Sequence, residues 1–379
     1  MELKPGYKQT EAGIIPIEWE IQPLGDVIEF LDGRRRPVKD SDRTKMKGTI
    51  PYYGASGIVD YVNQYIFDEN LILLGEDGEN ILSRNCKLAF QISGKTWVNN
   101  HAHVLRPKAW MDIGYLAELL ESLNYSQFNT GTAQPKLNKQ VCSNIPIVCP
   151  PLPEQRAIAA ALSDTDALLS SLDRLLAKKR DIKQAVMQQL LTGKQRLPGF
   201  SGEWEYEELG NLVRITKGQQ LNRAELSSST GFAAWNGGIE PSGFTDTWNT
   251  TENTITISEG GNSCGFVGFV RQKFWCGGHC YALLNVSSEL DRTFLYFLLK
   301  SQQSLIMSLR MGSGLPNIQR KYLSELPLLY PTLSEQVVIA AVLSDMDAEI
   351  DALQQRRDKT RAVKQGMMQE LLTGRTRLL

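Results

Sequence analysis

The feature that most constrains this chain is a long segment that occurs twice. Residues 146–197 and 327–378 align without a gap at a separation of 181 positions, and roughly half of the aligned positions are identical. Glu154-Gln155 returns as Glu335-Gln336, and Leu191-Thr192-Gly193 returns as Leu372-Thr373-Gly374. Self-similarity at a fixed long spacing reports duplicated architecture. We therefore expect two equivalent halves, each a globular block followed by one copy of this matched segment.

The two blocks that precede the matched segments share only a faint skeleton. We place Tyr53-Gly54 opposite Asn236-Gly237, and each block also has a Glu-Trp-Glu triplet and a later pair of tryptophan and histidine. These landmarks are Glu18-Trp19-Glu20, Trp97 and His101 in the first block, and Glu203-Trp204-Glu205, Trp275 and His279 in the second. The expected division is therefore a first domain over 1–150, a helix over 151–197, a second domain over 198–331 and a second helix over 332–379.

Each matched segment has the composition of one long helix. From Glu154 to about Leu191 there is no glycine or proline, and the sequence is rich in strong helix formers. Prolines precede this stretch, and Gly193 follows it as a stop. Apolar residues recur at near-heptad spacing: Ile158, Leu162, Leu168, Leu169, Leu172, Leu175, Leu176, Ile182, Val186 and Leu190.

The second copy repeats this stripe, so each helix offers the other a partner. Because a globular block separates the two copies, we expect the helices to pack antiparallel as a coiled coil, with the halves related by a pseudo-two-fold. The alternative is two ordinary core helices, since amphipathic helices are common. The match along the whole helix favours a rigid spacer.

The blocks themselves have a mixed composition. Short β-rich runs at 71–74, 88–92, 255–257 and 266–270 are separated by glycine and asparagine turns. Apolar helices are expected over 113–128 and 293–309, each followed by a glycine- and proline-containing loop at 131–138 and 312–319. The fold class is therefore α+β, with two mixed α/β domains joined by two long helices.

Composition excludes several kinds of protein. A hydrophobic content of 42% and a net charge of −1 are ordinary for a globular protein, so a nucleic-acid surface would have to be a local patch. No apolar run is long enough to span a membrane, and the N-terminus lacks a signal-peptide pattern. Six cysteines in so long a chain suggest reduced thiols. We expect a cytoplasmic protein.

Motifs that carry catalysis are mostly absent. The chain has no phosphate-binding GxxxxGK[ST] loop, no Asn/Asp-Pro-Pro-aromatic motif for a flipped adenine, and no dinucleotide fingerprint in a strand-to-helix context. Cys264, Cys276, His279 and Cys280 could form a zinc ligand set. The first block has no cysteines at the positions that match Cys276 and Cys280, so we favour buried reduced cysteines and expect no metal and no catalytic residue.

Two polar loops are better candidates for function. The first block carries Arg34-Arg35-Arg36 and a mixed-charge stretch from Lys39 to Lys47, while the second carries Gln219, Gln220 and Asn222 at the matching place. Arginine and lysine bind phosphates, and arginine, asparagine and glutamine can each make paired hydrogen bonds to base edges. A solvated surface loop is the plain alternative for any one of these residues. As a set, they lie where the two blocks differ most.

The order of these motifs resembles the specificity subunit of type I restriction-modification systems. The resemblance rests on Gln134-Pro135-Lys136-Leu137-Asn138, on Pro-Pro-Leu-Pro-Glu-Gln at 150–155, and on the helix that ends in Leu191-Thr192-Gly193. The second copy repeats the pattern, with Thr332 and Ser334 in place of prolines. Gly6-Tyr7-Lys8 with Ile15-Pro16 and Glu18-Trp19 is similar to the family's opening. Each motif alone is weak, but two copies in this order are specific.

The resemblance implies a subunit that selects DNA and performs no chemistry itself. Each domain would read one half of a bipartite asymmetric site in double-stranded DNA. The helices would set the spacer and carry two methyltransferase subunits, with Glu154, Gln155, Glu335 and Gln336 expected at the docking surface. S-adenosylmethionine, Mg and ATP are expected on the methyltransferase and restriction subunits, and no cofactor on this chain. The expected DNA contacts are Arg34, Arg35, Arg36, Lys39, Tyr53, Ser56, Asn99, His101, Lys136 and Asn138 in the first block, and Lys217, Gln219, Gln220, Asn222, Arg223, Trp235, Asn236, Asn317, Gln319 and Arg320 in the second.

Two other classes of function stay open at this point. One is an enzyme, a fused restriction-methyltransferase remnant, against which the missing motifs argue. The other is an interaction protein whose coiled coil joins two protein-binding domains. Salt-dependent and sequence-selective DNA binding by the assembled complex would separate this class from a DNA specificity subunit.

Overall fold

A computed structural model of the chain describes residues 5–227, 229–312, 314 and 316–378. The chain divides into two compact units: unit 1 comprises 1–173 and 355–379, and unit 2 comprises 174–354. Each unit therefore contains one globular block together with part of both long helices. This division differs from the expected one, which kept the helices apart from the blocks.

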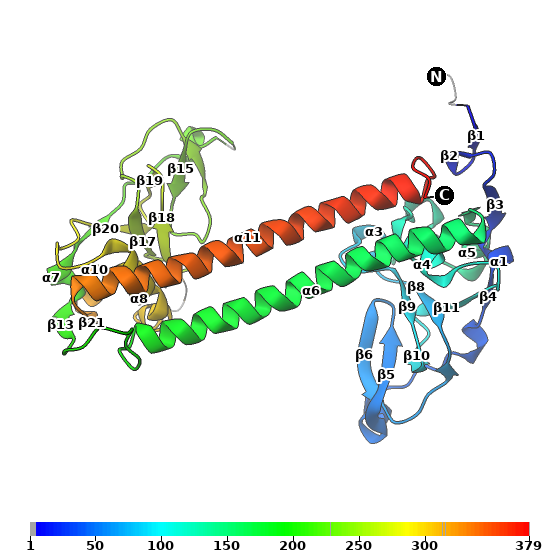
Figure 1. The fold of residues 1–379 in the computed structure, drawn as a ribbon, viewed down its shortest axis with the longest axis horizontal. Coiled ribbons are helices and arrows are strands. Elements are labelled where there is room, and N and C mark those ends of the chain that lie inside the picture. Colours follow the sequence, from blue (N-terminus) through cyan, green and yellow to red (C-terminus); the bar gives the residue numbers. More distant parts are fainter. Residues whose placement is uncertain (1–4, 228, 313, 315, 379) are drawn as a thin grey trace. The chain divides into compact units, whose positions relative to one another are not determined.

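Unit 1 is built on a four-stranded sheet in the order β4-β11-β8-β9, in which every neighbouring pair is antiparallel. A second sheet, β6-β5-β10-β7, and two two-stranded ribbons, β12-β3 and β1-β2, complete it (Figure 1). The strands are β1 Tyr7–Thr10, β2 Gly13–Pro16, β3 Glu20–Pro23, β4 Ile28–Phe30, β5 Lys47–Gly54, β6 Gly57–Val62, β7 Phe67–Asp68, β8 Leu71–Gly75, β9 Ala89–Ile92, β10 Lys95–Val98, β11 Ala102–Pro107 and β12 Pro146–Cys149. The helices are α1 Leu24–Val27, α2 Asp40–Arg43, α3 Asn80–Ser83, α4 Ile113–Ser122 and α5 Lys139–Ser143, with single 3-10 turns at Asp32–Arg34, Thr44–Met46 and Ser126–Phe128.

Unit 2 repeats the main elements of unit 1 in the same order. Its sheet β14-β20-β17-β18 matches β4-β11-β8-β9, its sheet β16-β15-β19 matches β6-β5-β10, and its ribbon β13-β21 matches β3-β12 (Figure 1). The strands are β13 Glu205–Glu208, β14 Arg214–Lys217, β15 Phe232–Trp235, β16 Gly243–Thr245, β17 Thr254–Ser258, β18 Val267–Val270, β19 Trp275–Cys276, β20 Cys280–Leu284 and β21 Pro327–Tyr330. The helices are α7 Leu209–Leu212, α8 Arg292–Ser301, α9 Gln303–Ser308 and α10 Arg320–Ser324, with a 3-10 turn at Arg223–Glu225.

The strand predictions are confirmed, and the two apolar helices are shorter than expected. All four expected β-rich runs lie in β8, β9, β17 and β18. The helix expected over 113–128 ends at Ser122, because the Asn124 side chain accepts the Ser126 N–H and starts a turn. The helix expected over 293–309 is interrupted at Gln302, whose backbone leaves the helical region, and it continues as α9.

The two long helices are confirmed as α6, Leu152–Leu190, and α11, Leu333–Leu371. Gly193 and Gly374 follow them with φ of 67° and 71°, the left-handed conformation that ends a helix at low cost for glycine.

The helices pack antiparallel in each unit, because residue numbers rise along one as they fall along the other. In unit 1, Asp166 of α6 meets Lys364 of α11 at 2.7 Å, and in unit 2 Lys183 of α6 meets Asp347 of α11. These two ion pairs join residues that are equivalent in the repeat.

The expected apolar stripe is only partly used for packing. Ile158, Leu162, Leu172, Leu176 and Leu190 are buried. Leu168, Leu175 and Ile182 instead remain 40%, 38% and 40% exposed, which corrects their assignment to the helix interface. Each unit has its own main core: Trp19, Tyr115 and Leu162 lie in that of unit 1, and Phe294, Tyr330 and Leu343 lie in that of unit 2.

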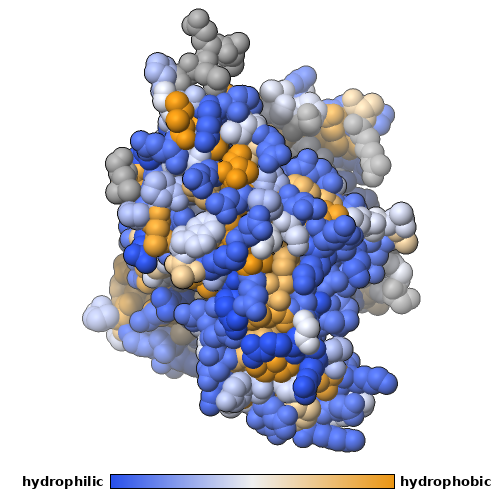
Figure 2. All heavy atoms as spheres, turned by 90° about the vertical axis from the view of Figure 1, so that its right-hand side faces the viewer, coloured by the Kyte–Doolittle hydropathy of each residue, from blue (hydrophilic) through white to orange (hydrophobic). Residues whose placement is uncertain are grey.

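The outer surface is mainly hydrophilic, with separate apolar patches among the polar side chains on the face shown in Figure 2. Within the described part of the chain, no helix is long and apolar enough to cross a membrane.

Candidate nucleic-acid interface

Several of the residues that the sequence indicates in the first domain, among them Arg35, Asn99 and Lys136, lie at one end of its main sheet. There β8 ends, β11 begins and β4 ends, since Gly75 pairs with Ala102 and Phe30 with Leu105. The Asn99 N–H donates to the Tyr53 carbonyl at 3.0 Å, which joins the turn before β11 to the end of β5. The end of β5 and the turn before β11 therefore lie side by side at this end of the sheet.

Glu76 is the centre of this end of unit 1, and it was not among the predicted site residues. Its carboxylate accepts from Arg35 at 2.7 Å and lies 3.4 Å from the Lys136 ammonium. Its backbone carbonyl accepts the Leu137 N–H at 2.8 Å, while Gly78 N–H donates to the Pro135 carbonyl at 3.0 Å. Glu76 and its neighbours therefore fix the loop over 131–138 that follows the first block.

These contacts change the roles expected for several basic residues. Arg35 also donates to the Ala102 carbonyl at 2.6 Å, and its side chain is only 13% exposed, so it is a structural residue and not a free phosphate contact. Lys136 shares the Glu76 carboxylate but remains 51% exposed. Arg34 stacks on the Phe67 ring at 4.6 Å and pairs with Glu69 at 3.3 Å.

Six of the ten residues predicted as DNA contacts in the first block are exposed, and the other four are at least partly buried. Asn138 accepts the Val141 N–H at 2.8 Å and so caps α5. Tyr53 is half-buried against Phe90, and burial raises its pKa. Asn99 is buried. The exposed residues among those predicted are Arg34, Arg36, Lys39, Ser56, His101 and Lys136.

A buried histidine supports the same loop from below. His103 on β11 is 1% exposed, with Nδ1 2.7 Å from Asp32 and Nε2 2.8 Å from the Leu137 carbonyl. Burial alone would lower the pKa of His103, but hydrogen bonds to Asp32 and Cys142 outweigh it and raise the pKa to about 10. The imidazole is therefore charged at neutral pH, and Asp32 carries the opposite charge. A histidine inside the apolar run Ala102-His103-Val104-Leu105 was the sequence signal for this pair.

Unit 2 has the same backbone hydrogen bonds at the equivalent sheet end, and we call this shared set of backbone hydrogen bonds the frame. The side chains around it differ between the units. Glu259 is equivalent to Glu76: its carbonyl accepts the Ile318 N–H at 2.8 Å, and Gly261 N–H donates to the Pro316 carbonyl at 3.0 Å. Its carboxylate binds Lys217 at 2.5 Å, so Lys217 is engaged within the domain. At the position of His103 stands Tyr281, whose hydroxyl donates to the Ile318 carbonyl at 3.1 Å.

Exposed amides surround this frame in unit 2. A groove of about 780 Å³ at the sheet end is lined in part by Gln220, Asn236, Trp275 and His279. Trp235 is half-buried against the apolar cluster of Phe274 and Cys276. The exposed residues among those predicted are Lys217, Gln219, Gln220, Asn222, Asn317, Gln319 and Arg320. The side chain of Arg223, and Ser313 and Leu315 of the loop over 312–319, lie outside the described residues.

The strand register also corrects one equivalence. Tyr53 pairs with Val98 and Trp235 pairs with Cys276, so Tyr53-Gly54 lies opposite Trp235-Asn236 and not opposite Asn236-Gly237.

The four residues expected at the docking surface are enclosed, which makes that expectation wrong. Glu154 and Glu335 are 0% exposed, and Gln155 and Gln336 are 1% and 0% exposed. Glu154 accepts two hydrogen bonds from Arg377, at 2.5 and 2.8 Å, and one from the Trp19 indole at 3.0 Å.

In unit 2 the same group is formed by equivalent residues. Glu335 accepts from Arg196 at 2.6 Å at the position equivalent to Glu154, and the Arg196 guanidinium lies 5.8 Å from the Trp204 ring. Gln155 and Gln336 accept the N–H groups of Asp112 and Asp291 at 2.7 and 2.9 Å, just before α4 and α8. The repeated Glu-Gln pairs therefore attach the first turn of each long helix to the unit in which that helix begins.

The cysteines considered as zinc ligands are buried inside unit 2. Cys264, Cys276 and Cys280 are 0%, 2% and 2% exposed, and all six cysteines are free thiols. Burial raises the pKa of the Cys264 thiol. Among the residues that the structure describes, no group of three or more histidine, cysteine, aspartate or glutamate residues is arranged to hold a metal ion.

The chain thus carries two domains of the same fold with different exposed side chains, and comparison with known proteins gives the family. The family of the type I restriction modification DNA specificity domain matches twice, over residues 16–179 and 201–360, and the chain belongs to this family. Its members are DNA-recognition subunits and not catalytic ones.

Several known proteins are similar to the chain over different lengths. A putative type I restriction enzyme specificity subunit of Haemophilus influenzae is 38% identical over 154 residues, which cover 41% of this chain and 38% of that protein. The matches to this relative and to two from Mycoplasma span less than half the length of each relative. The MjaVIII specificity subunit of Methanocaldococcus jannaschii is 25% identical, over 98% of this chain and 96% of that protein. The crystal structure of the S subunit from M. genitalium has the same fold, with a TM-score of 0.72 at 17% identity, over 97% of this chain and 99% of that one.

Proposed function

We propose that this chain selects the DNA site of a type I restriction-modification complex, with each unit reading one half of a bipartite asymmetric sequence. The observation that carries this proposal is one frame bearing two sets of side chains. Glu76, Gly78 and Pro135 in unit 1 have the same backbone bonds as Glu259, Gly261 and Pro316 in unit 2. Around this frame unit 1 exposes Arg36 and Lys39, whereas unit 2 exposes mainly amides. Readers of different half-sites require a common scaffold with unlike contact residues.

The methylated motif tests this proposal. The chain is expressed with its partner methyltransferase subunits in a host free of adenine methylation, and modified adenines are mapped across the genome. We expect methylation within one bipartite motif. Methylation without a motif, or a motif confined to one short continuous sequence, would contradict two independent readers.

The same proposal gives the repeated helices a second role, as the docking surface of two methyltransferase subunits. Since the Glu-Gln pairs are buried, the docking surface has to be found among repeated residues that are exposed. Ala160, Ser163 and Asp164 lie on one face of α6, and their counterparts in α11 are identical. Of the counterparts, Ala341 and Asp345 are exposed and Ser344 is half-buried. A face of identical sequence on two helices, beside blocks that differ, suits two copies of one partner.

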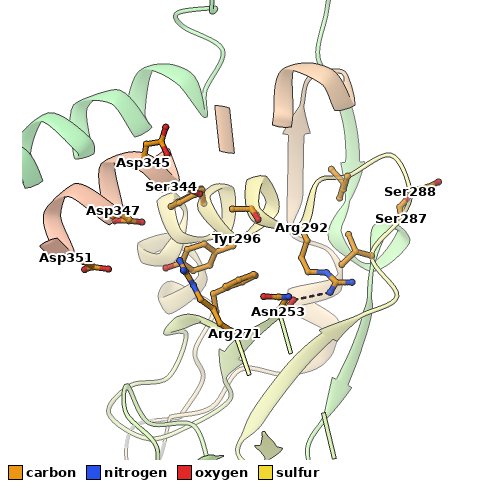
Figure 3. A pocket seen from close by; sticks show the side chains of 16 residues that line it. Asn253, Arg271, Ser287, Ser288, Arg292, Tyr296, Ser344, Asp345, Asp347 and Asp351 are labelled. Carbon is orange, nitrogen blue, oxygen red and sulfur yellow. Dashed lines mark hydrogen bonds between the residues drawn. The ribbon is translucent and has the colours of Figure 1, made fainter. Parts of the chain in front are cut away.

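A groove borders this face in each unit. In unit 2 it lies between β18, α8 and α11, has a volume of about 1150 Å³, and places Asp345, Asp347 and Asp351 on the helix side with Arg271 and Arg292 below (Figure 3). In unit 1 the equivalent groove lies between β9, α4 and α6 and includes Ser163 and Asp166. A partner segment that carries basic groups toward the helix would be complementary to either groove.

Charge reversal tests the docking surface. Asp164→Arg and Asp345→Arg should each remove one of the two methyltransferase subunits, and the double variant should remove both, as measured by the mass of the complex in light scattering. Asp181→Arg is the matched control, because Asp181 is exposed on α6 but its counterpart in α11 is Ala362. Full occupancy in the double variant would exclude this face.

A further inference from the structure

Each unit has a histidine on the turn that enters the central strand of its main sheet. His101 lies between β10 and β11, and His279 lies between β19 and β20. Their carbonyls accept the N–H groups of Glu76 and Glu259, both at 2.9 Å, so the two turns have the same place in the frame. Their side chains are 51% and 60% exposed, at the sheet end where the candidate DNA contacts gather.

An asparagine fixes each histidine turn, and it comes from a different sequence position in each unit. Asn99 Oδ1 accepts the His101 N–H at 2.8 Å, and Asn236 Oδ1 accepts the His279 N–H at 3.2 Å. Asn99 belongs to the turn itself, whereas Asn236 follows the neighbouring strand β15.

The strand register makes these two positions complementary. It places Asn99 opposite Gly277 and Asn236 opposite Gly54 in the comparison of the units. A Cβ on Gly277 would lie 2.5 Å from Asn236 Oδ1, and a Cβ on Gly54 would lie 3.6 Å from Asn99 Nδ2. In each unit the glycine therefore lies beside the asparagine side chain that fixes the histidine turn. Unit 1 supplies that side chain from the turn, and unit 2 supplies it from the neighbouring strand end.

The carboxylate beside each imidazole also comes from a different sequence position in each unit. Asp77 lies 2.9 Å from His101 Nδ1, and Glu259 lies 3.7 Å from His279 Nδ1. Asp77 follows Glu76, which is the true counterpart of Glu259. Within the described residues, neither imidazole has a hydrogen-bond partner at Nε2.

Two units that differ in most loops thus both place an exposed imidazole beside a carboxylate, on a turn fixed by an asparagine, through different residues. This pattern indicates a constraint on the exposed imidazole and not on a sequence motif. What two readers of unlike half-sites have in common is the sugar-phosphate backbone, which carries no sequence information. A protonated imidazole beside a carboxylate, hydrogen-bonded to it in His101 and 3.7 Å from it in His279, can donate a hydrogen bond from Nε2 to an anion.

We propose that His101 and His279 make equivalent contacts to a phosphodiester oxygen of the two half-sites and so set the register of each domain on DNA. Asn99 and Asn236 are the positioning residues of this contact. The inference rests on the proposed function, and it separates the shared backbone contact from the base-reading residues, which differ between the units.

The test uses the complex of the full chain with its methyltransferase subunits. Binding is measured for His101→Ala and His279→Ala on a cognate duplex and on duplexes with either half-site scrambled, across a range of salt concentrations. Each variant should lose about tenfold in affinity on all duplexes alike, and the slope of log affinity against log salt should fall by about 1. The methylated motif should not change. A changed motif would show base reading, and unchanged affinity would exclude any contact; either result overturns the inference.

A second experiment moves the asparagine side chain of unit 2 from position 236 to position 277, which distinguishes a positioning role from a role in folding. Asn236→Gly alone should weaken binding like His279→Ala, and Asn236→Gly with Gly277→Asn, which copies the arrangement of unit 1, should restore it. Failure of the double variant to restore affinity, with an unchanged unfolding midpoint, would contradict the positioning role. Wild-type complex without any sequence selectivity would refute the proposed function itself. Selective wild-type complex with unaffected histidine variants would refute only this inference.

Discussion

The bidentate contact between Arg377 and Glu154 gives the sharpest stability prediction. Arg377 lies at the end of the chain, and Glu154 lies in the first turn of α6, so this ion pair ties the residues after α11 to the start of the other long helix in unit 1. Both guanidinium bonds are short, at 2.5 and 2.8 Å, and Glu154 is fully buried. Arg377→Ala would leave a buried carboxylate with the Trp19 indole as its remaining side-chain partner.

Removing one member of a buried ion pair costs about 3–5 kcal/mol. Arg377 itself is 27% exposed, which places the expected loss near the lower value, about 3 kcal/mol. For a unit of this size a loss of 3 kcal/mol lowers the unfolding midpoint by about 6–12 °C. Calorimetry gives the midpoint, and hydrogen exchange assigns the loss to unit 1.

Arg196→Ala is the matched variant, because Arg196 makes the equivalent contact with Glu335 in unit 2. It should destabilise unit 2 and leave the protection of unit 1 unchanged. Arg377→Ala with Glu154→Gln should recover part of the loss, because the buried charge is then removed. A loss below about 1 kcal/mol for Arg377→Ala, the size of a surface pair, would refute the reasoning.

Three further predictions follow from the packing. The pKa of His103 is raised to about 10, against 6.5 in the unfolded chain, so its charged pair with Asp32 stabilises unit 1 fully below about pH 6.5 and this contribution is lost as the pH rises through about 10. The difference in unfolding midpoint between wild type and His103→Gln should therefore narrow from pH 7 to pH 10. A constant difference would contradict a charged imidazole. Gly374→Ala should lower the free energy of unfolding in urea more than Gly193→Ala, for which the left-handed backbone alone costs about 1–2 kcal/mol. A Cβ at 374 would lie 2.5 Å from the Pro16 ring, whereas a Cβ at 193 would lie 3.2 Å from Trp204. Equal losses would exclude the Pro16 contact. Insertion of seven helical residues into both α6 and α11 lengthens each helix by about 10.5 Å. The non-specific spacer of the methylated motif should then lengthen by about three base pairs. An unchanged spacer would show that the helices do not set the distance between the half-sites.

The long helices and the main strands of this protein could be predicted from sequence because the sequence patterns that define them are local or repeated. The absence of glycine and proline across 154–191, and the same absence up to Gly366 in the copy, defines two long helices. The apolar run Leu71-Ile72-Leu73-Leu74 defines the central strand β8. Such patterns depend on neighbouring residues, which determine most of the backbone conformation.

The roles of charged residues could not be predicted in the same way. Arg35 appeared free for phosphate because its partner, Glu76, is distant in sequence. Glu154 and Gln155 appeared to be docking residues because they recur, but they recur to satisfy Arg377 and the backbone of Asp112. Recurrence identifies a constraint, and only geometry shows whether that constraint is internal packing or a partner.

The exchange of one recognition block tests the central claim most directly. Residues 20–145 are replaced by the equivalent block of another specificity subunit, and the methylated motif is read from the genome of the host. We predict that one half of the motif changes while the other half and the spacer stay as they were. A change in both halves, or in neither, would contradict two independent readers on a shared frame.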